Sequence, residues 1–467
     1  MIIRLAIRSL ATRPLRTAVL SVGFGLSIAV MAELLGVGEV ILEQAHAPAL
    51  AGGGDVVLTG AVGPLESARF VASGVLGSEQ FRSRVAAASP SRRATLYMLS
   101  ANANGPIAVR GGIPSRERAV GDPEVEGQAG WIDEPRDAAW IDPKPGDLLR
   151  AMDRFHAMPE VDGTAAGRSS FAEWLYFNAR SADGAERFYL TFMAGAPDAA
   201  GARPMAVRLQ LDRGGATTNF SAAGSVSDRD VLERAPDLDV AGNRVRVGDD
   251  GRYAITLALG SEMTPARLTG DIVLTPTAGR SLPPAAIHGA RGWVSGYTVP
   301  VMSGVFTGTL RVGGEDLRVD GMAGYHDHNW GFWEGVRWQW GQVASGDLSI
   351  VYGRVFPPPE VADPSRMPGF LGVIGPQGPI AFSTDVSIRE DDNAGTPRVV
   401  TVESRDRQMQ LTMRLDVRES VRTTMGLTRG ASGAMTFVQL GGEYHVTGRA
   451  GARDINFTAR GSAETFR

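Results

Sequence analysis

The stretch "FAEWLYFNARSADGAERFYLTFMAG", residues 171–195, decides the fold that we expect for most of the chain. Two runs rich in aromatic and aliphatic residues flank the turn-forming tripeptide "ADG". Short alternating runs separated by Gly and Asp predict antiparallel strands joined in a hairpin. We therefore predict that this stretch forms two paired strands with one packed face.

Runs of the same kind continue to the C-terminus. Examples are "PMAVRLQLD", "RYAITLALG", "LTGDIVLTP", "GVFTGTLRVGG", "LSIVYGRVF", "MQLTMRLDV" and "INFTARGSAETF". They are too many strands for one small barrel, whereas two successive barrels accommodate them. The sequence therefore predicts a mainly β protein with two consecutive antiparallel β-barrels, the first over residues 161–290 and the second over residues 291–467.

Composition excludes several classes of function. The 467-residue chain has a net charge of -4, a pI near 6.0 and 21% charged residues, which give no reason to expect a nucleic-acid partner. Cysteine is absent, so disulfides and thiolate metal sites are excluded. Nothing in the composition calls for a cofactor, and we assign none.

The N-terminus carries the signal of a membrane anchor. Four arginines precede an uncharged run over residues 17–32, and further apolar residues extend this run to about residue 42. The basic flank predicts a cytoplasmic N-terminus, a single transmembrane helix within residues 1–43 and the rest of the chain outside the inner membrane. A cleaved signal peptide is the alternative, but its small-residue region "APALAG" lies far beyond the hydrophobic run. A buried soluble helix accounts poorly for the four arginines.

The segment "LAIRSLATRPLRTAVLSVGFGLSIAVMAELLG" resembles the first membrane span of FtsX/MacB-type ABC transporter permeases. "DVVLTGAVGPLESARFVASGVLG" and "RVAAASPSRRATLYMLSA" resemble the extracytoplasmic part that follows, so the likeness covers roughly residues 1–120. No later run is long enough for a second span and no Walker A pattern occurs, so the chain by itself is neither channel nor ATPase. The resemblance implies ABC transporter subunits as partners. Residues 44–160 are then an extracytoplasmic segment and linker, with a short helix in "LLRAMDRFHAM", residues 148–158.

The densest group of polar and aromatic residues is "GYHDHNWGFWEGVRWQWG", residues 324–341, which holds four of the eight tryptophans. If "YHDHNWG" is a strand, alternation places His326, His328 and Trp330 on one face and Asp327 on the other. This juxtaposition of imidazole, carboxyl and indole groups makes the stretch our candidate site.

Two roles are open to its histidines. His326 and His328 have a spacing that suits zinc, but a catalytic zinc site needs a third protein ligand, and the fold would have to supply His288 or His445. Alternatively, the histidines hydrogen-bond at a barrel end while the neighbouring tryptophans fill the core. We assign no metal.

Two stretches carry a second resemblance. "FAEWLYFNARSADGAERFYLTFM" and "YTVPVMSGVFTGTLRVGGEDLRVDGMAGYHDHNWG" resemble the AttH-like group, which contains the carotenoid 1,2-hydratases (hydroxyneurosporene synthases, CrtC) and related cyclases. The likeness covers roughly residues 160–467, with Leu175 in place of the second tryptophan of the family's opening motif. It implies that the two barrels are lipocalin-like and enclose an apolar cavity, and it does not imply one reaction.

The chemistry of a hydratase indicates which residues matter. Such an enzyme must protonate carbon in a dry site and then stabilise a tertiary carbocation until water arrives. A buried carboxylic acid or an imidazolium suits the first task, and indole faces suit the second. The residues to which we assign a catalytic role are His328, Trp330, Asp327 and Tyr352, and those assigned to ligand binding are His326, Trp338, Trp340, Trp174 and Tyr176.

One position departs from the pattern that the resemblance implies. The hydratases carry an acid two residues beyond a tyrosine on a following strand, whereas here Tyr352 is followed by Arg354, and the nearest acid is Asp347. Two functions therefore stay open. The chain is either a membrane-anchored extracytoplasmic protein that binds a lipid or isoprenoid for a transporter, or a hydro-lyase or cyclase of the hydratase type.

Overall fold

The computed structural model describes residues 12, 14–15, 22, 53–60, 65, 67–76, 79–99, 104–161, 165–261, 263–393, 395–425 and 435–466. They divide into two compact units, one made of Met1–Leu65 and Ala87–Asp137 and the other of Glu66–Ala86 and Ala138–Arg467. No helix within the described part of the chain is long and apolar enough to cross a membrane. The predicted anchor lies outside the described residues, apart from isolated positions.

The smaller unit is built on a hairpin. Strands β1 (Ser91–Leu99) and β2 (Asn104–Gly112) pair antiparallel, and the short helices α5 (Pro114–Ala119) and α6 (Pro123–Glu126) and the 3-10 turn η2 (Pro135–Asp137) follow. Arg110 on β2 forms ion pairs with three carboxylates from this helical region, of which two are buried. The arginine therefore ties the hairpin to the helices.

The larger unit begins with short helical segments. They are α3 (Ala68–Phe70), the π-turn η1 (Val71–Val75), α4 (Glu79–Arg82), α7 (Ala138–Ile141), α8 (Pro145–Met152) and α9 (Ala165–Ser169). The helix predicted within residues 148–158 is α8, which begins earlier because Pro145 suits the first helical turn and Asp147 accepts a hydrogen bond from the Lys144 amide. The chain from Asp153 onward is irregular.

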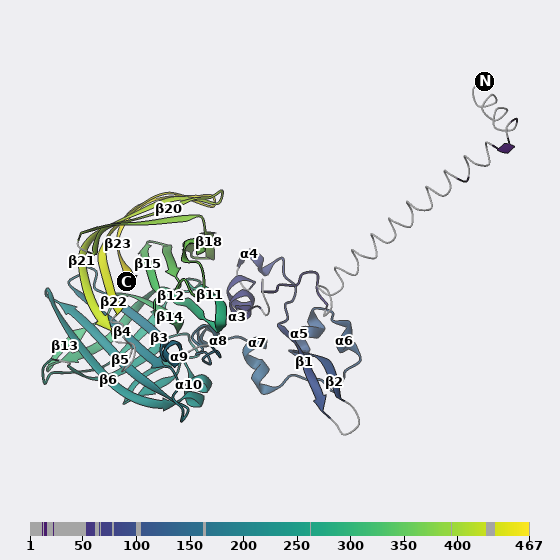
Figure 1. Ribbon diagram of the computed structural model, residues 1–467, viewed down its shortest axis with the longest axis horizontal. Helices are drawn as coiled ribbons and strands as arrows, with labels where there is room; N and C mark the ends of the chain where they lie inside the picture. Colours follow the sequence, from purple (N-terminus) through teal and green to yellow (C-terminus); the bar gives the residue numbers. More distant parts are fainter. Residues whose placement is uncertain are drawn as a thin grey trace. The chain divides into compact units, whose positions relative to one another are not determined.

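Eight strands of the larger unit close into an antiparallel barrel (Figure 1). Their order is β10-β12-β14-β3-β4-β5-β6-β9, and the pairing of β9 with β10 completes the ring. They are β3 (Phe171–Arg180), β4 (Glu186–Gly195), β5 (Ala202–Arg213), β6 (Ala216–Ser227), β9 (Tyr253–Ser261), β10 (Arg267–Pro276), β12 (Val294–Val312) and β14 (Met322–Phe332). Helix α10 (Asp228–Arg234), the 3-10 turn η3 (Ala290–Gly292) and the short strands β7 (Leu238–Val240), β8 (Asn243–Val247), β11 (Leu282–His288) and β13 (Glu315–Arg318) accompany the barrel.

The remaining nine strands form a second antiparallel sheet, in the order β18-β17-β16-β15-β23-β22-β21-β20-β19. No pairing among the described residues joins its edge strands β18 and β19, so it is an open half-barrel. Its strands are β15 (Arg337–Ser345), β16 (Leu348–Phe356), β17 (Phe370–Gly375), β18 (Gly378–Ser383), β19 (Val386–Asn393), β20 (Thr396–Arg405), β21 (Met409–Met425), β22 (Met435–Ala450) and β23 (Arg453–Phe466), with the 3-10 turn η4 (Pro364–Arg366).

The prediction of a mainly β protein is confirmed, but the barrels differ from the expected division at residue 290. The first barrel takes two of its strands, β12 and β14, from beyond that position, so the "HDHNWG" motif belongs to the first barrel and not to the second. The reason is that β3 and β10 each need a partner on their open edge, and β14 and β12 supply these hydrogen bonds.

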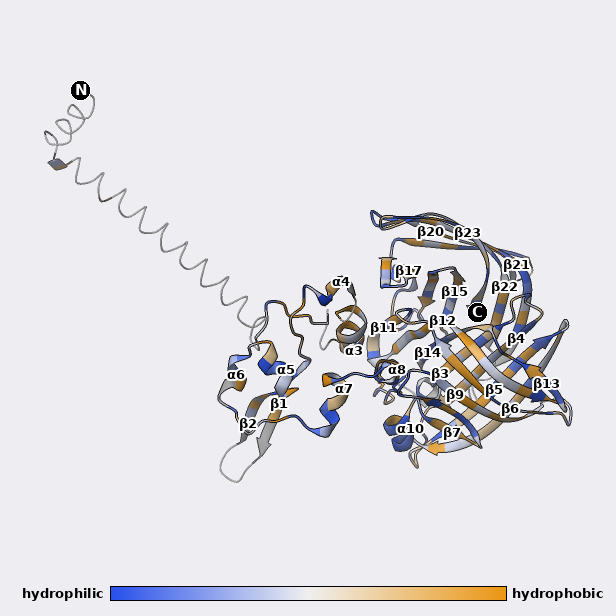
Figure 2. Cartoon of the chain, turned by 180° about the vertical axis from the view of Figure 1, so that it is seen from behind, coloured by the Kyte–Doolittle hydropathy of each residue, from blue (hydrophilic) through white to orange (hydrophobic). Residues whose placement is uncertain are grey.

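Alternation along the strands explains both cores. On β9 the burial pattern alternates strictly at first, beginning with the fully buried Tyr253, and Figure 2 shows hydrophobic and hydrophilic positions alternating along the barrel strands. The inward side chains, among them Phe177, Phe188 and Phe192, form one cluster without solvent exposure. Side chains therefore pack the barrel interior, as in small barrels generally.

Candidate functional site

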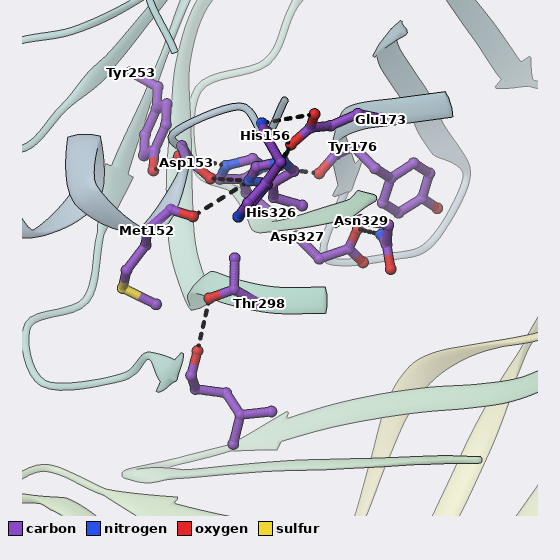
Figure 3. Close-up of polar contacts among 12 residues, drawn as sticks. Met152, Asp153, His156, Glu173, Tyr176, Tyr253, Thr298, His326, Asp327 and Asn329 are labelled. Atoms are coloured by element: carbon purple, nitrogen blue, oxygen red, sulfur yellow. Dashed lines mark hydrogen bonds and ion pairs between the residues drawn. The ribbon is translucent and has the colours of Figure 1, made fainter. Parts of the chain in front are cut away.

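Strand β14 presents its side chains alternately to two different environments. His326 is paired in register with Phe177 and therefore faces the barrel core, whereas Asp327 is paired with Tyr176 and faces outward. Figure 3 shows His326 with Asp153 on one side of the strand, and Asp327 with the Tyr176 ring on the other. The alternation predicted from the sequence is confirmed, and it divides the motif between two sites.

The inward residues of β14 join a buried group that we call the inner network: Asp153, His156, Glu173, Arg203, Tyr253, His326 and His328. Asp153 follows α8 and covers the barrel end. Its Oδ2 lies 3.0 Å from His326 Nε2 and accepts a hydrogen bond of 2.6 Å from the Tyr253 hydroxyl. The other ring nitrogen of His326 lies 3.0 Å from the Tyr176 carbonyl. His326 therefore connects β3 to the irregular segment after α8.

The other half of the inner network centres on Glu173. Its Oε1 lies 2.9 Å from His328 Nε2 and 2.7 Å from His156 Nδ1, and both of its oxygens accept the His156 amide. Arg203 lies 3.7 Å from Oε2 and donates to the His156 carbonyl at 2.8 Å. Side chains of Glu173, Arg203 and His328 have no exposed surface, whereas that of His156 is 33% exposed.

Electrostatics follow from this pairing. Burial by itself lowers the pKa of His328, but the hydrogen bond and charge of Glu173 together with the charge of Asp153 outweigh it, and the pKa is raised. Burial raises the pKa of Glu173, but the hydrogen bonds from His156 and His328 outweigh it, and the pKa is lowered. Both shifts therefore favour the charged forms of the two groups.

Aromatic rings pack against the imidazoles of the inner network. His326 stacks on Phe177 with a centroid distance of 4.1 Å, and His156 stacks on Trp330 at 4.2 Å. Trp330 itself is 4% exposed. Gly296 on β12 leaves the space for its indole, because a Cβ at that position would collide with the ring. The side chains of the inner network are therefore closely packed with aromatic rings at one end of the barrel.

The outward residues of β3 and β14 meet the open half-barrel. The indole of Trp340 donates to the Tyr325 hydroxyl at 3.1 Å, and the Gln439 amide donates to the Tyr176 hydroxyl at 3.3 Å. Asn329 donates to Asp327 at 2.7 Å. We call this region the inter-sheet face and define it by Trp174, Tyr176, Tyr325, Asp327 and Asn329 from the barrel and by Trp338, Trp340, Gln439 and Glu464 from the half-barrel.

Two carboxyl groups of the inter-sheet face are unusually weak acids. Burial raises the pKa of Asp327 to about 7, although Tyr325 donates a hydrogen bond to it. Burial and then the charge of Asp327 raise the pKa of Glu464 to about 8. Glu464 is paired in register with Trp340 on one side and with Gln439 on the other, so its side chain points to the same face as theirs.

The inter-sheet face combines aromatic surface with partial exposure. Trp174, Trp338, Trp340 and Glu464 are each partly buried rather than fully enclosed. Trp338 also stacks on Phe466 with a centroid distance of 4.1 Å. A protonated carboxyl group can supply a proton, and indole faces beside it can stabilise the cation that forms.

The structure brings together only part of the predicted site. Asp327, Trp174, Tyr176, Trp338 and Trp340 share the inter-sheet face. On the opposite face of that strand, His326 and His328 belong to the inner network, and Trp330 stacks on His156 of that network.

Tyr352 joins neither group. It lies in the core of the half-barrel, where its hydroxyl is 3.1 Å from that of Tyr444. Arg354, two residues along β16, donates to the Pro364 carbonyl. Asp347 is bound by Arg453 at the surface. Tyr352, which we grouped with the "HDHNWG" motif from the sequence, therefore lies in a separate core.

The histidines considered as third zinc ligands are also elsewhere. His445 is half-exposed on β22 and pairs with Asp416, and His288 is exposed at the end of β11. Instead, His156 and Glu173 approach His328. Sequence reasoning missed the acids Asp153, Glu173 and Glu464, and only Glu173 had a signal, its place in the "FAEWLYFN" stretch.

Comparison with known proteins gives distant likenesses of fold. No family of known proteins matches the chain by sequence, and no curated protein matches it. Among solved structures, an AttH protein of Nitrosomonas europaea is similar over 63% of this chain and 92% of its own, with 19% identity and a TM-score of 0.43. Kievitone hydratase of Nectria haematococca is similar over 66% and 93%, with 14% identity and a TM-score of 0.42. CghA in complex with Sch210972 is similar over 67% and 96%, with 13% identity and a TM-score of 0.41. Because these identities and TM-scores are low, the likenesses carry no argument about the function of this chain.

Proposed function

We propose that the chain binds an apolar, unsaturated small molecule at the inter-sheet face and that the paired carboxyl groups there add a proton to it. The observation that carries the proposal is the placement of Asp327 and Glu464 together among the indoles of Trp338 and Trp340. The raised pKa of Glu464 supports it, because a carboxyl group that stays protonated near neutral pH is a competent general acid.

The chemistry follows from these groups. The O–H bond of Glu464 breaks as its proton forms a C–H bond with the less substituted alkene carbon, which leaves a tertiary carbocation. The indole faces stabilise this cation by about 2 kcal/mol or more where it is desolvated. Water adds to the cation and returns a proton to the carboxylate pair, which gives a tertiary alcohol. If a second alkene of the same molecule attacks the cation instead, a ring forms with the positive charge on a new carbon, and transfer of a proton from the neighbouring carbon to the Glu464 carboxylate gives a cyclic alkene. The proposed class is therefore a hydratase or a cyclase.

Isotope labelling tests this proposal. The full chain is incubated with an acyclic isoprenoid that bears a terminal alkene, in water enriched in heavy oxygen, and we expect a labelled tertiary alcohol. Glu464→Gln should lower the rate by about 10²- to 10⁴-fold, because it removes the general acid. Asp416→Asn on β21 of the same sheet is the matched control and should leave the rate unchanged, since its carboxylate pairs with Arg414 and His445.

A carrier without chemistry is the second candidate. The partly exposed tryptophans of the inter-sheet face favour it, together with the permease-like N-terminal segment. Saturable quenching of Trp338 and Trp340 fluorescence by isoprenoids, with no labelled product from the wild-type chain, would assign the carrier function and end the enzyme proposal for those ligands. Full activity of Glu464→Gln would end the assignment of the acid.

The membrane anchor and the association with a transporter are proposals that rest on the sequence. We propose that residues 17–42 cross the inner membrane once and hold the barrels on its outer side, and that ABC transporter subunits are partners. The basic flank and the permease-like segment support this.

A further inference from the structure

We propose that His156, Glu173 and His328 form a binding site for a divalent transition-metal ion such as zinc, on the opposite face of β14 from the inter-sheet face. His328 Nε2, His156 Nδ1 and a carboxylate oxygen of Glu173 lie within 4.8 Å of one another. Two imidazole nitrogens and one carboxylate oxygen are the donor set of many catalytic zinc sites. This inference is independent of the proposed function, because the inter-sheet face lies on the other side of the strand.

The two imidazoles converge on a single oxygen. His156 Nδ1 and His328 Nε2 approach the same Oε1 of Glu173, at 2.7 and 2.9 Å. In the metal-free state each of these nitrogens must carry a hydrogen to make such a contact. A metal ion replaces both hydrogens with one cation that all three ligands share. Zinc–nitrogen distances of about 2.1 Å separate tetrahedral ligand atoms by about 3.4 Å, so the two contacts of Glu173 Oε1, at 2.7 and 2.9 Å, must each lengthen by about 0.5–0.7 Å.

The segment that would have to move is irregular. His156 lies beyond the end of α8, within a stretch that has neither helix nor strand, and its ring is 33% exposed. Glu173 and His328, in contrast, are held on neighbouring strands of the barrel with no exposed surface. The strands therefore supply two fixed ligands, and the segment after α8 supplies a third that can adjust and that gives solvent access to the ion.

The groups around the second ring nitrogen of His328 independently support a metal site. Its other nitrogen, Nδ1, lies 3.3 Å from the Met152 carbonyl and 3.6 Å from Asp153 Oδ1. That Asp153 oxygen is buried and has no hydrogen-bond partner among the described residues. Metal-bound histidines characteristically donate their second N–H to a carbonyl or carboxylate, which fixes the tautomer that offers the other nitrogen to the metal. Asp153 is placed to accept that bond when His328 binds an ion.

The donor set also indicates which ion binds. Imidazole suits zinc, cobalt, nickel and copper, whereas magnesium and calcium require more oxygen ligands than this group offers. Three protein ligands leave at least one coordination position for water. The proposed site thus uses one histidine of the "HDHNWG" motif, with His156 and Glu173 as partners. The zinc ligands that we considered from the sequence, and did not assign, were His326 and His328 with His288 or His445.

Cobalt binding tests the site without any activity assay. The full chain is purified without a histidine tag, stripped with EDTA and titrated with Co²⁺, and we expect one equivalent to bind with a visible d–d absorption that Zn²⁺ removes by competition. His156→Gln should weaken the affinity by at least about tenfold, and Asp153→Asn by about 10- to 100-fold, because the carboxylate placed to accept the second N–H of His328 is lost. His445→Gln is the matched control and should bind as the wild type does, because its ring pairs with surface acids.

Fluorescence gives a second readout that locates the ion. Trp330 stacks on His156, so bound Co²⁺ should quench it, and Trp330→Phe should remove that part of the quenching. Absence of a stoichiometric d–d signal, or equal affinity in the wild type and in folded His156→Gln, would overturn the proposal and leave a hydrogen-bonded network. Loss of binding in His445→Gln would overturn it as well, since the ion would then lie on β22.

Discussion

At the scale of single residues, neighbouring positions on β14 have opposite surroundings. His328 is enclosed by Glu173 and the segment after α8, and Asp327, one residue earlier, faces the half-barrel. A change of one residue in register would exchange these environments. Glu464, the second acid of the inter-sheet face, lies on β23. No motif surrounds it in the sequence, so sequence reasoning did not single it out.

The raised pKa of Glu464 predicts a pH dependence of stability. Its usual pKa is 4.5 and burial raises it to about 8, so between these values the folded state holds a proton that the unfolded chain has released. The free energy of unfolding should therefore fall as pH rises through this window and level off above it. Urea unfolding at several pH values between about 5 and 9 measures this slope.

Comparison of two variants isolates the contribution of this group. In Glu464→Gln the decline should be shallower than in the wild type, because the substituted side chain does not titrate. Glu443→Gln on β22 changes a side chain that is 42% exposed and should keep the wild-type slope. Identical slopes in the wild type and Glu464→Gln would contradict the assigned acidity.

At the scale of elements, one carboxylate joins the barrel to the segment after α8. Glu173 on β3 contacts His156, Arg203 and His328. Glu173→Gln removes the carboxylate that His328 contacts, whereas Arg203 keeps its ion pair with Asp228. Breaking a buried ion pair by removing one partner costs about 3–5 kcal/mol. Denaturant unfolding of EDTA-treated protein measures the loss, since a bound metal would add a further term.

A surface carboxylate provides the comparison for that change. Glu403 on β20 pairs with Arg389 and Arg405, whose side chains are 60% and 79% exposed. Glu403→Gln should leave the free energy of unfolding nearly unchanged, because exposed ion pairs contribute little to stability. Similar losses in the two variants would show that the inner network does not hold the barrel end.

The contact between β12 and β14 depends on one glycine. A Cβ at Gly296 would collide with the Trp330 indole, which is packed on the far side by His156 and cannot retreat. Gly296→Ala should therefore destabilise the protein by about 1–3 kcal/mol, as overpacking does, and shift the Trp330 emission. Gly130→Ala, where a Cβ meets no atom within 4 Å, is the control and should do neither.

At the scale of the whole molecule, strand order and chain order diverge. The barrel closes only when β12 and β14 enter beside β10 and β3, so the chain returns to the first barrel after residue 290 before it builds the half-barrel. This return places the "HDHNWG" strand in the wall of the barrel. One of its faces points into the barrel core, and the other faces the half-barrel.

The predicted topology belongs to the same scale. The arginine-flanked run before residue 43 predicts a cytoplasmic N-terminus and an external C-terminus. A reporter that is active only outside the inner membrane, fused after Arg467, should be active, and a cytoplasmic reporter at the same position should be silent. The reverse pattern would contradict both the anchor and the proposed external location. Substitution of the four N-terminal arginines by glutamate is the matching test, since it should weaken the orientation.

The sequence alone determined what depends on local periodicity. Alternation identified the strands and the mainly β class, and it assigned His326, His328 and Trp330 to one face of β14 and Asp327 to the other. These features are local because side-chain direction in a strand depends only on position along it.

Tertiary structure decided which faces meet. Strand order and register decide that one sheet closes and the other does not, and that the charge of Asp327 acts on Glu464. They also bring Asp153 and His156 beside the motif and turn Tyr352 into a separate core. These relations join residues far apart in the chain, and backbone hydrogen bonds between distant strands fix them. No pattern within a short stretch of sequence specifies such pairings, because the same alternation is compatible with several strand orders.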